Sequence, residues 1–183
     1  IIDGVTINVK AADVGNVHTL SVSNDSEAAL EKVKKFVTDF NAAVVTMSQL
    51  RRFNPTTKEA GPLLGDAMLR GVESTLRNVA ADAVAGASTP FNTLASIGIT
   101  TQQDGTLKLD ESKLNSSLNG SFDAVGKLFG STAGIASRMH DFLDRQLKSD
   151  APINSRTDAL NSSKRVNDRD RERLEARMTA VEL

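Results

Sequence analysis

The side chains that most often carry out chemistry in proteins are few in this sequence and do not cluster. The two histidines, His18 and His140, lie on segments of different predicted type. Zinc sites need clustered nitrogen and sulfur ligands, and the chain contains no Cys. We therefore expect no metal site, no disulfide and no thiolate chemistry.

The acidic and small polar residues also lack the spacing of a reactive centre. Asp168 and Asp170 are two residues apart on a predicted helix, so their carboxylates point in different directions. The stretch GKLFGSTAG, residues 126–134, has Gly, Lys and Ser without the order of a phosphate-binding loop. No Ser, His and Asp set has positional support as a triad. We predict no catalytic residue and no cofactor, and hence a chain that is not an enzyme.

Composition restricts the remaining classes of function. The 183 residues carry a formal net charge of −1, whereas nucleic-acid-binding modules usually present a basic patch. No stretch approaches the roughly 18 apolar residues of a membrane span. We expect neither nucleic-acid binding nor membrane insertion. Ile1 is not an initiator Met and opens no signal peptide, so we expect a piece of a longer protein.

The elements that would position any functional residue begin with two strands. Residues 5–9 (VTINV) and 17–22 (VHTLSV) alternate in the manner of half-buried strands, with a loop containing Gly15 between them. Because two strands alone are marginally stable in water, we expect them to join further strands.

Two long helices are predicted next, near 26–52 and 62–84. Asn24, Asp25 and Ser26 offer helix caps, with Glu27 three residues after Asn24 as in a capping box, and Pro62 is tolerated in a first helical turn. The first helix carries apolar residues at intervals of three and four, which make one stripe along a rod. The stripe consists of Leu30, Val33, Val37, Phe40, Val44 and Met47.

A small hairpin is predicted over 96–109. Apolar and small residues alternate around Ile99 and again around Leu107, and Asp104-Gly105 supplies a tight turn. We expect the first strand to include Ile97, and we interpret the hairpin as scaffold that orients the helices around it.

Shorter helices follow the hairpin. Asp110 is a candidate cap for a helix over 110–118, and a second helix is expected over 121–129. The stretch 130–134 is glycine-rich, which indicates a joint.

The last part of the chain, 135–183, is predicted to be a helical, coiled-coil-like extension broken near Pro152. Apolar residues recur every seven positions beyond the proline, as at one core position of a coiled coil. The companion positions are mostly polar, so the seam is thin; an exposed helix with accidental periodicity would show the same pattern. We expect this chain alone to be monomeric or weakly associating. The seam residues are Ile153, Leu160, Asn167, Leu174 and Val181.

Together these elements predict an α+β fold. Long helices pack with a small antiparallel hairpin in a core domain over 1–134, and the extension occupies 135–183.

Four blocks of sequence, in this order, resemble one family, the flagellar filament cap proteins, also called hook-associated protein 2. The first block is DGVTINVKAADVGNVHTLSVSND. The second is Phe36, Val37, Phe40 and Asn41, with Phe40 where Tyr is commoner. The third is Pro62, Leu63, Gly65 and Asp66. The fourth comprises Gly98, Ile99, Asp104, Gly105, Leu107, Asp110, Leu128 and Phe129.

The resemblance implies the C-terminal part of a leg domain. It implies a structural cap at the distal, extracellular end of the bacterial flagellar filament. Such a cap promotes flagellin folding and polymerisation, prevents loss of unpolymerised flagellin, and in some members contributes to adhesion. The implied partners are further copies of the chain in a cap ring, flagellin, and the flagellar export machinery with its chaperone. Export would follow the flagellar type III route without a cleaved signal peptide.

The match leaves out the family's head domains and the N-terminal part of its leg domain, and members continue past Leu183. Flagellin or a hook–filament junction protein would share the helical legs and the absence of Cys. The remaining candidates are a secreted adhesin with no assembly role and a generic coiled-coil scaffold.

Overall fold

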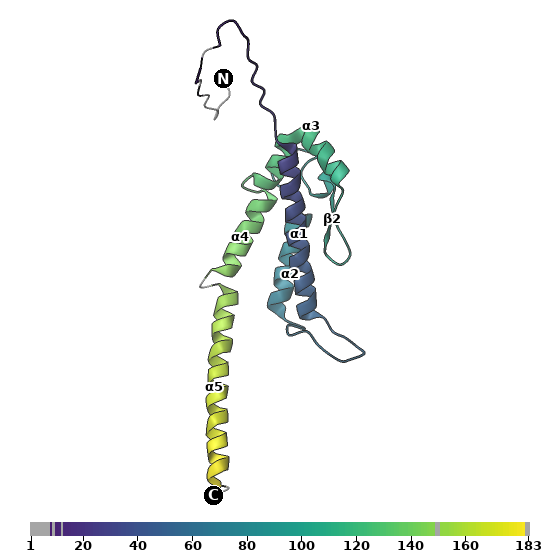
Figure 1. Ribbon diagram of the computed structural model, residues 1–183. Helices are drawn as coiled ribbons and strands as arrows, with labels where there is room; N and C mark the ends of the chain where they lie inside the picture. Colours follow the sequence, from purple (N-terminus) through teal and green to yellow (C-terminus); the bar gives the residue numbers. More distant parts are fainter. Residues whose placement is uncertain (1–7, 9, 12, 149–150, 182–183) are drawn as a thin grey trace.

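The protein is a set of long helices packed around one central helix, with a small hairpin on one side (Figure 1). The computed structural model describes residues 8, 10–11, 13–148 and 151–181. Strands β1 and β2 form an antiparallel pair, which confirms the predicted α+β class. In chain order the elements are α1 (Ser26–Arg51), α2 (Ala67–Ala81), the short 3-10 helix η1 (Ala95–Ile97), β1 (Ile99–Thr101), β2 (Leu107–Leu109), α3 (Glu111–Gly130), α4 (Ile135–Leu147) and α5 (Pro152–Val181).

Helix α1 is the continuous rod that its apolar stripe predicts. Asp25 caps it by accepting a hydrogen bond of 2.8 Å from the Ala28 N–H. Helix α2 runs back beside it, and α3 and the hairpin lie against its other faces (Figure 1). Five residues of the stripe are buried: Val33, Val37, Phe40, Val44 and Met47.

The centre of the core lies where the hairpin meets α3 and α4. The largest side chains that are almost wholly removed from solvent come from these elements, from η1 and from the residue before η1. Burial of this kind contributes about 1.5–3 kcal/mol for each large aliphatic side chain. These residues are Leu94, Ile97, Ile99, Leu114, Leu128 and Ile135.

The start of the second helix differs from the prediction. The helix expected from Pro62 begins instead at Ala67, and the residues before it form turns. Gly65 has a positive φ of 77°, which no helix continues through. Asp66 then caps α2 through a 2.9 Å hydrogen bond from the Leu69 N–H. The helix also ends at Ala81 rather than near residue 84.

The first strand of the hairpin also begins later than predicted. Ile97 belongs to η1, not to the strand, and β1 starts at Ile99. Gly98 separates them with a positive φ of 96°. A Cβ at Gly98 would lie 2.9 Å from the Asp110 carbonyl oxygen, so only glycine fits against the start of α3.

The turn of the hairpin follows the Asp104-Gly105 prediction. The Asp104 carboxylate accepts hydrogen bonds from the Thr106 N–H at 2.9 Å and the Thr106 hydroxyl at 2.6 Å. The Thr106 hydroxyl and then its N–H hold the pKa of Asp104 below its usual value. Gly105 has a φ of 88°, and the Gly105 N–H donates to the Gln102 carbonyl.

The two short helices predicted after the hairpin are joined in α3. Asp110 caps it through the Lys113 N–H at 2.9 Å, as predicted. Ser121, with φ −153° and ψ 52°, is a non-helical residue between two helical stretches, so the break in α3 lies where the second helix was predicted to begin.

Helices α4 and α5 make up the predicted extension, but they differ in packing. Ile135 and Phe142 of α4 are buried in the common core. Pro152 is the first residue of α5, in agreement with the predicted break near it. No described residue of α5 is buried, so α5 is the part that stands away from the body (Figure 1).

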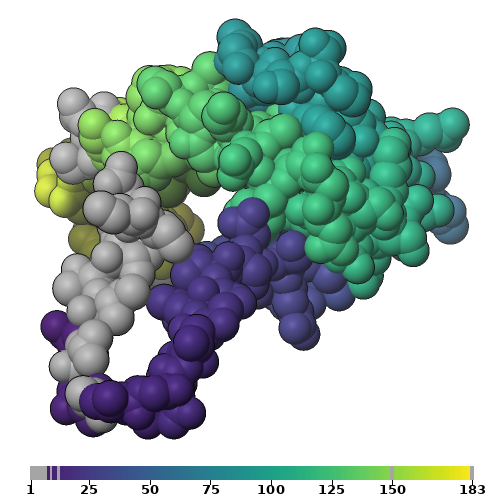
Figure 2. Space-filling model, turned by 90° about the horizontal axis from the view of Figure 1, so that it is seen from above, coloured from purple at the N-terminus to yellow at the C-terminus, as the bar shows by residue number. Residues whose placement is uncertain are grey.

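The two N-terminal strand predictions have different outcomes. Of residues 5–9, positions 5–7 and 9 lie outside the described residues. The strand predicted over 17–22 is wrong, because these residues form no ladder with any described strand. Val17 is 96% exposed, and Figure 2 shows the purple stretch before α1 standing clear of the helices. A strand needs a partner for its backbone groups, and neither of the described strands supplies one.

Gly105→Val tests the turn. The positive φ disfavours a β-branched side chain, so we expect a loss of about 1 kcal/mol or more in the free energy of unfolding. Urea denaturation measures the loss. Thr100→Val, at an exposed strand position, is the control and should leave the midpoint nearly unchanged. An equal midpoint for Gly105→Val and the parent protein would contradict this placement.

Candidate functional site

The second and fourth family-like motifs of the sequence meet along one side of α1. The Asn41 side chain makes two hydrogen bonds to the main chain of Leu107 in β2. Its amide nitrogen donates to the Leu107 carbonyl at 2.8 Å, and its amide oxygen accepts from the Leu107 N–H at 2.7 Å. One side chain of the helix thereby binds the strand as a neighbouring strand would.

The direction of the Leu107 backbone explains this contact. The Gln102 N–H donates to the Thr106 carbonyl at 2.7 Å. Because hydrogen-bonded and non-hydrogen-bonded pairs alternate in an antiparallel ladder, the next pair, Thr101 with Leu107, is non-hydrogen-bonded. The N–H and carbonyl of Leu107 therefore face away from β1 and toward α1, where Asn41 binds both.

The aromatic residues of the motifs also converge. The ring of Phe36 on α1 packs edge-to-face against Phe129 of α3, with centroids 5.8 Å apart and planes at 78°. Phe40, one turn along α1, lies with its centroid 6.1 Å from that of Phe36. Such pairs stabilise a fold by about 0.5–1.5 kcal/mol beyond their buried area.

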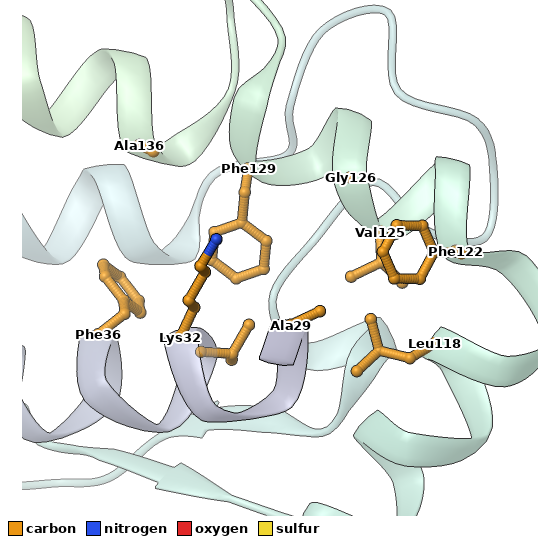
Figure 3. Close-up of a pocket in the computed structure, with 10 residues that line it drawn as sticks. Ala29, Lys32, Phe36, Leu118, Phe122, Val125, Gly126, Phe129 and Ala136 are labelled. Carbon is orange, nitrogen blue, oxygen red and sulfur yellow. The ribbon is translucent and has the colours of Figure 1, made fainter. Parts of the chain in front are cut away.

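Beside these rings lies an apolar groove formed by α1, α3 and α4, with a volume of about 310 Å³. Figure 3 shows Phe36 and Lys32 rising from α1 toward Phe129, with Leu118, Phe122 and Val125 along the other side. The groove is lined by Ala29, Lys32, Val33, Phe36, Leu118, Phe122, Val125, Gly126, Phe129 and Ala136.

The chemistry of this groove is limited to burial of apolar groups. Lys32 is the one charged residue among its lining residues. The groove offers no carboxylate, imidazole or hydroxyl that could transfer a proton or attack a substrate. It suits the side chains of a packed polypeptide element.

Ion pairs join the helices that the apolar core brings together. Lys34 of α1 contacts Glu111 of α3 at 2.8 Å, and the hydrogen bond to Glu111, followed by that to Glu31, raises the pKa of Lys34. Arg51 of α1 contacts Glu73 of α2 at 2.7 Å. These partners are distant in sequence, so no local pattern could have identified them.

Two further ion pairs involve the residues at the ends of α2. Arg138 of α4 contacts Asp82, which follows α2, at 3.1 Å. Arg156 of α5 contacts the capping residue Asp66 at 2.5 Å. The hydrogen bond from Arg156, followed by that from the Leu69 N–H, lowers the pKa of Asp66.

The third motif lies at the opposite end of α1 from the groove. The Leu63 N–H donates to the Leu50 carbonyl at 2.9 Å, which docks the turn before α2 onto the end of α1. Pro62 is exposed at the surface of that turn. The motif thus sets where α2 starts, and it adds nothing to the groove.

The predicted seam of α5 is separate from all of these contacts. Leu160, Leu174 and Val181 are 60%, 56% and 85% exposed. Asn167 is exposed as well, whereas Ile153 is half-buried near the body. In a straight helix a seven-residue repeat drifts by about 20° per heptad, so the seam winds around α5.

The residues considered first for chemistry are dispersed. His18 lies 2.8 Å from Asp13 on the exposed N-terminal stretch, and His140 is exposed on α4. Asp168 pairs with Lys164 one turn earlier. Within the described parts of the chain, no three His, Asp or Glu residues are grouped so that they could hold a metal ion. Over the same residues, no helix combines the length and the apolar character needed to cross a membrane.

Comparison with known proteins relates this arrangement to a family. The family described as "Flagellar hook-associated protein 2 C-terminus" matches residues 1–182. The chain is 30% identical to flagellar hook-associated protein 2 of Vibrio cholerae, over 99% of this chain and 28% of that protein. It is 32% identical to A-type flagellar hook-associated protein 2 of Pseudomonas aeruginosa, over 97% of this chain and 38% of that protein.

A solved structure has the same fold. The crystal structure of the flagellar cap protein FliD D1-D2-D3 domains from Escherichia coli matches with a TM-score of 0.67 and 33% identity, over 75% of this chain and 37% of that chain. The chain therefore spans well under half the length of these relatives.

Asn41→Ala tests the contact between α1 and the hairpin. The substitution leaves a partly buried N–H and carbonyl of Leu107 without partners, so we expect a loss of about 2–4 kcal/mol in the free energy of unfolding. Asn78→Ala, at an exposed position of α2, is the matched control and should change it by less than about 0.5 kcal/mol. Similar denaturation midpoints for the two variants would contradict the role of Asn41.

Gly126→Leu tests the groove. A Cβ at Gly126 meets open space, so the new side chain should enter the groove without a clash. We expect the fluorescence enhancement of a dye that binds apolar surfaces, such as anilinonaphthalene sulfonate, to be weaker than with the parent protein. Gly71→Leu is the control, since Gly71 is equally open on α2 but does not line the groove. Equal dye binding by both variants would show that the groove is not where the dye binds.

Proposed function

Since the chain belongs to the flagellar hook-associated protein 2 family, through the C-terminal part of that family's proteins, we propose that it is part of a filament cap. The cap sits at the distal end of the bacterial flagellar filament. It promotes flagellin folding and polymerisation and prevents loss of unpolymerised flagellin. The observation that carries this proposal is the match of the family over residues 1–182.

The surfaces of the chain support a structural role rather than a catalytic one. Its groove is apolar and lacks groups that transfer protons. Its motifs serve packing: Asn41 holds the hairpin, Gly98 admits the start of α3, and Asp66 caps α2. Each of these residues fixes the position of a helix, which suits a protein whose work is assembly.

We propose that the groove and the α5 seam contact other parts of the same cap protein. The relatives are much longer than this chain, so most of each relative lies outside the residues matched here. Leu160 and Leu174 of the seam would then be covered by another helix, and Asn167 would set its register at some cost in stability.

The proposal extends to partners and location. Further copies of the chain would form the cap ring, and flagellin would be the protein it acts on. The flagellar export machinery and its chaperone would deliver it to the outside of the cell without a cleaved signal peptide. The absence of Cys from the 183 residues supports export of an unfolded chain, because no disulfide can form within them on the way. A contribution to adhesion belongs to the same proposal.

Deletion of the gene tests this function. We expect cells that keep their hooks, lose their filaments and release flagellin monomers into the medium, measured by electron microscopy and immunoblotting. A flagellin-deletion strain is the control and should release none. Intact filaments in the deletion strain would favour an adhesin without an assembly role.

Localisation distinguishes the cap from the hook–filament junction proteins, whose loss could also release flagellin. An antibody against this chain should label the distal filament tip in immunogold micrographs. Labelling at the junction, or along the whole filament as for flagellin, would overturn the proposal.

A further inference from the structure

In the described part of the chain, the contacts of helix α5 with the body lie in its first two turns. The Asn154 side-chain amide donates to the carbonyls of Leu147 and Lys148 at 3.2 and 2.7 Å, and so caps the end of α4. Ala151, just before the helix, is buried. From residue 155 to residue 181 every position is exposed, so the direction of α5 depends on the contacts of its first turns.

The one ion pair between α5 and the helices of the body joins Arg156 to Asp66 among the described residues. The two groups lie 2.5 Å apart, and the Asp66 side chain is 10% exposed, against 44% for Arg156. The Asp66 carboxylate is also held by the Leu69 N–H at 2.9 Å as the cap of α2. Because this cap fixes the carboxylate, the ion pair ties an exposed helix to a rigid point.

Among the described residues, Asp66 forms its ion pair with Arg156. The polar pocket around Asp66, about 400 Å³, is also lined by Arg51, Arg70, Glu73 and Arg77. Arg51 is paired with Glu73 at 2.7 Å, and Arg70 donates to the Gly65 carbonyl at 2.9 Å. The hydrogen bond from Arg156, followed by that from the Leu69 N–H, lowers the pKa of Asp66 and so favours its charged form.

Because this pair lies near the start of α5, a small change of angle there moves the far end of the helix by a large distance. A helix rises by about 1.5 Å per residue, so roughly 38 Å of helix lie between Arg156 and Val181. A tilt of about 15° at the first turns would move the far end by about 10 Å. The Arg156 side chain is 44% exposed, so water reaches the pair from that side, whereas the Asp66 carboxylate is largely buried and salt screens the pair less than one between two exposed groups.

We propose that the Asp66–Arg156 ion pair is a latch that sets the direction of α5 relative to the body. With the latch closed, α5 points along one direction. With the latch open, α5 remains helical and samples a range of tilts, in which its seam is presented to a partner at different angles. This switch acts through the position of α5 and goes beyond the proposed role in the cap.

Two introduced cysteines provide the measurement, because the 183 residues contain no Cys. Ser74→Cys on α2 and Ser163→Cys on α5 are both exposed and carry nitroxide labels. Double electron–electron resonance then gives the distribution of distances between α2 and α5 in the parent protein and its variants.

Asp66→Asn removes the charge and keeps the cap of α2, because an Asn side-chain oxygen also accepts from the Leu69 N–H. Arg156→Gln removes the other partner. We expect either variant to widen the distance distribution at least twofold. The double variant should be no wider than each single variant. Arg169→Gln, on the exposed part of α5, is the matched control and should leave the distribution unchanged.

Three results would overturn the latch. The first is a distribution as narrow as the parent's in both Asp66→Asn and Arg156→Gln. The second is equal broadening in Arg169→Gln, which would indicate a general effect of charge. The third is a loss of helical circular dichroism in the Asp66→Asn and Arg156→Gln variants, which would mean that α5 unfolds instead of tilting.

Discussion

The contact between Asn41 and the Leu107 main chain is the constraint on which the rest of the structure depends. A hairpin with strands of three residues cannot hold itself together in water. The outward N–H and carbonyl of β2 find their partners in a side chain of α1. With the strand fixed to the helix, Ile97 and Ile99 enter the core, and the start of α3 falls against Gly98, where only a glycine fits.

Away from this junction, apolar contacts hold the helices together. Polar contacts between particular side chains help to define how the helices are positioned against one another. Apolar burial is not directional, whereas Lys34 with Glu111 and Arg51 with Glu73 join particular positions of two helices. The Asp66–Arg156 pair extends the same principle to α5, where no described residue of the helix is buried. The core and the ion pairs between helices both belong to the body, whereas the described contacts of α5 with the body lie in its first turns.

The residues that line the groove carry no reactive groups, and the motif residues serve to pack helices and strands. Glycines, helix caps and aromatic pairs fix the positions of helices, and they take no part in catalysis. Phe36 and Phe129 serve both the core and the groove, because they pack on each other and still border open apolar space. The chain belongs to a family of flagellar hook-associated proteins, and the proposed occupant of this apolar groove is another packed polypeptide element.

Local rules of the chain by themselves determined the rod of α1, the Asp104-Gly105 turn and the cap at Asp110, because periodicity, turn chemistry and capping act within a few residues. They offered Asp25 as one of three candidate caps for α1, and the structure selects it. The same rules misplaced the start of α2, put Ile97 in a strand and predicted a strand over 17–22. In each case the outcome depended on something distant in sequence or specific to backbone geometry: a left-handed Gly65, the approach of α3 to Gly98, or a strand partner that no described strand supplies. The binding of Asn41 to Leu107, the groove and the ion pairs between helices were decided only by the tertiary structure. They join residues that become neighbours only once the core has formed.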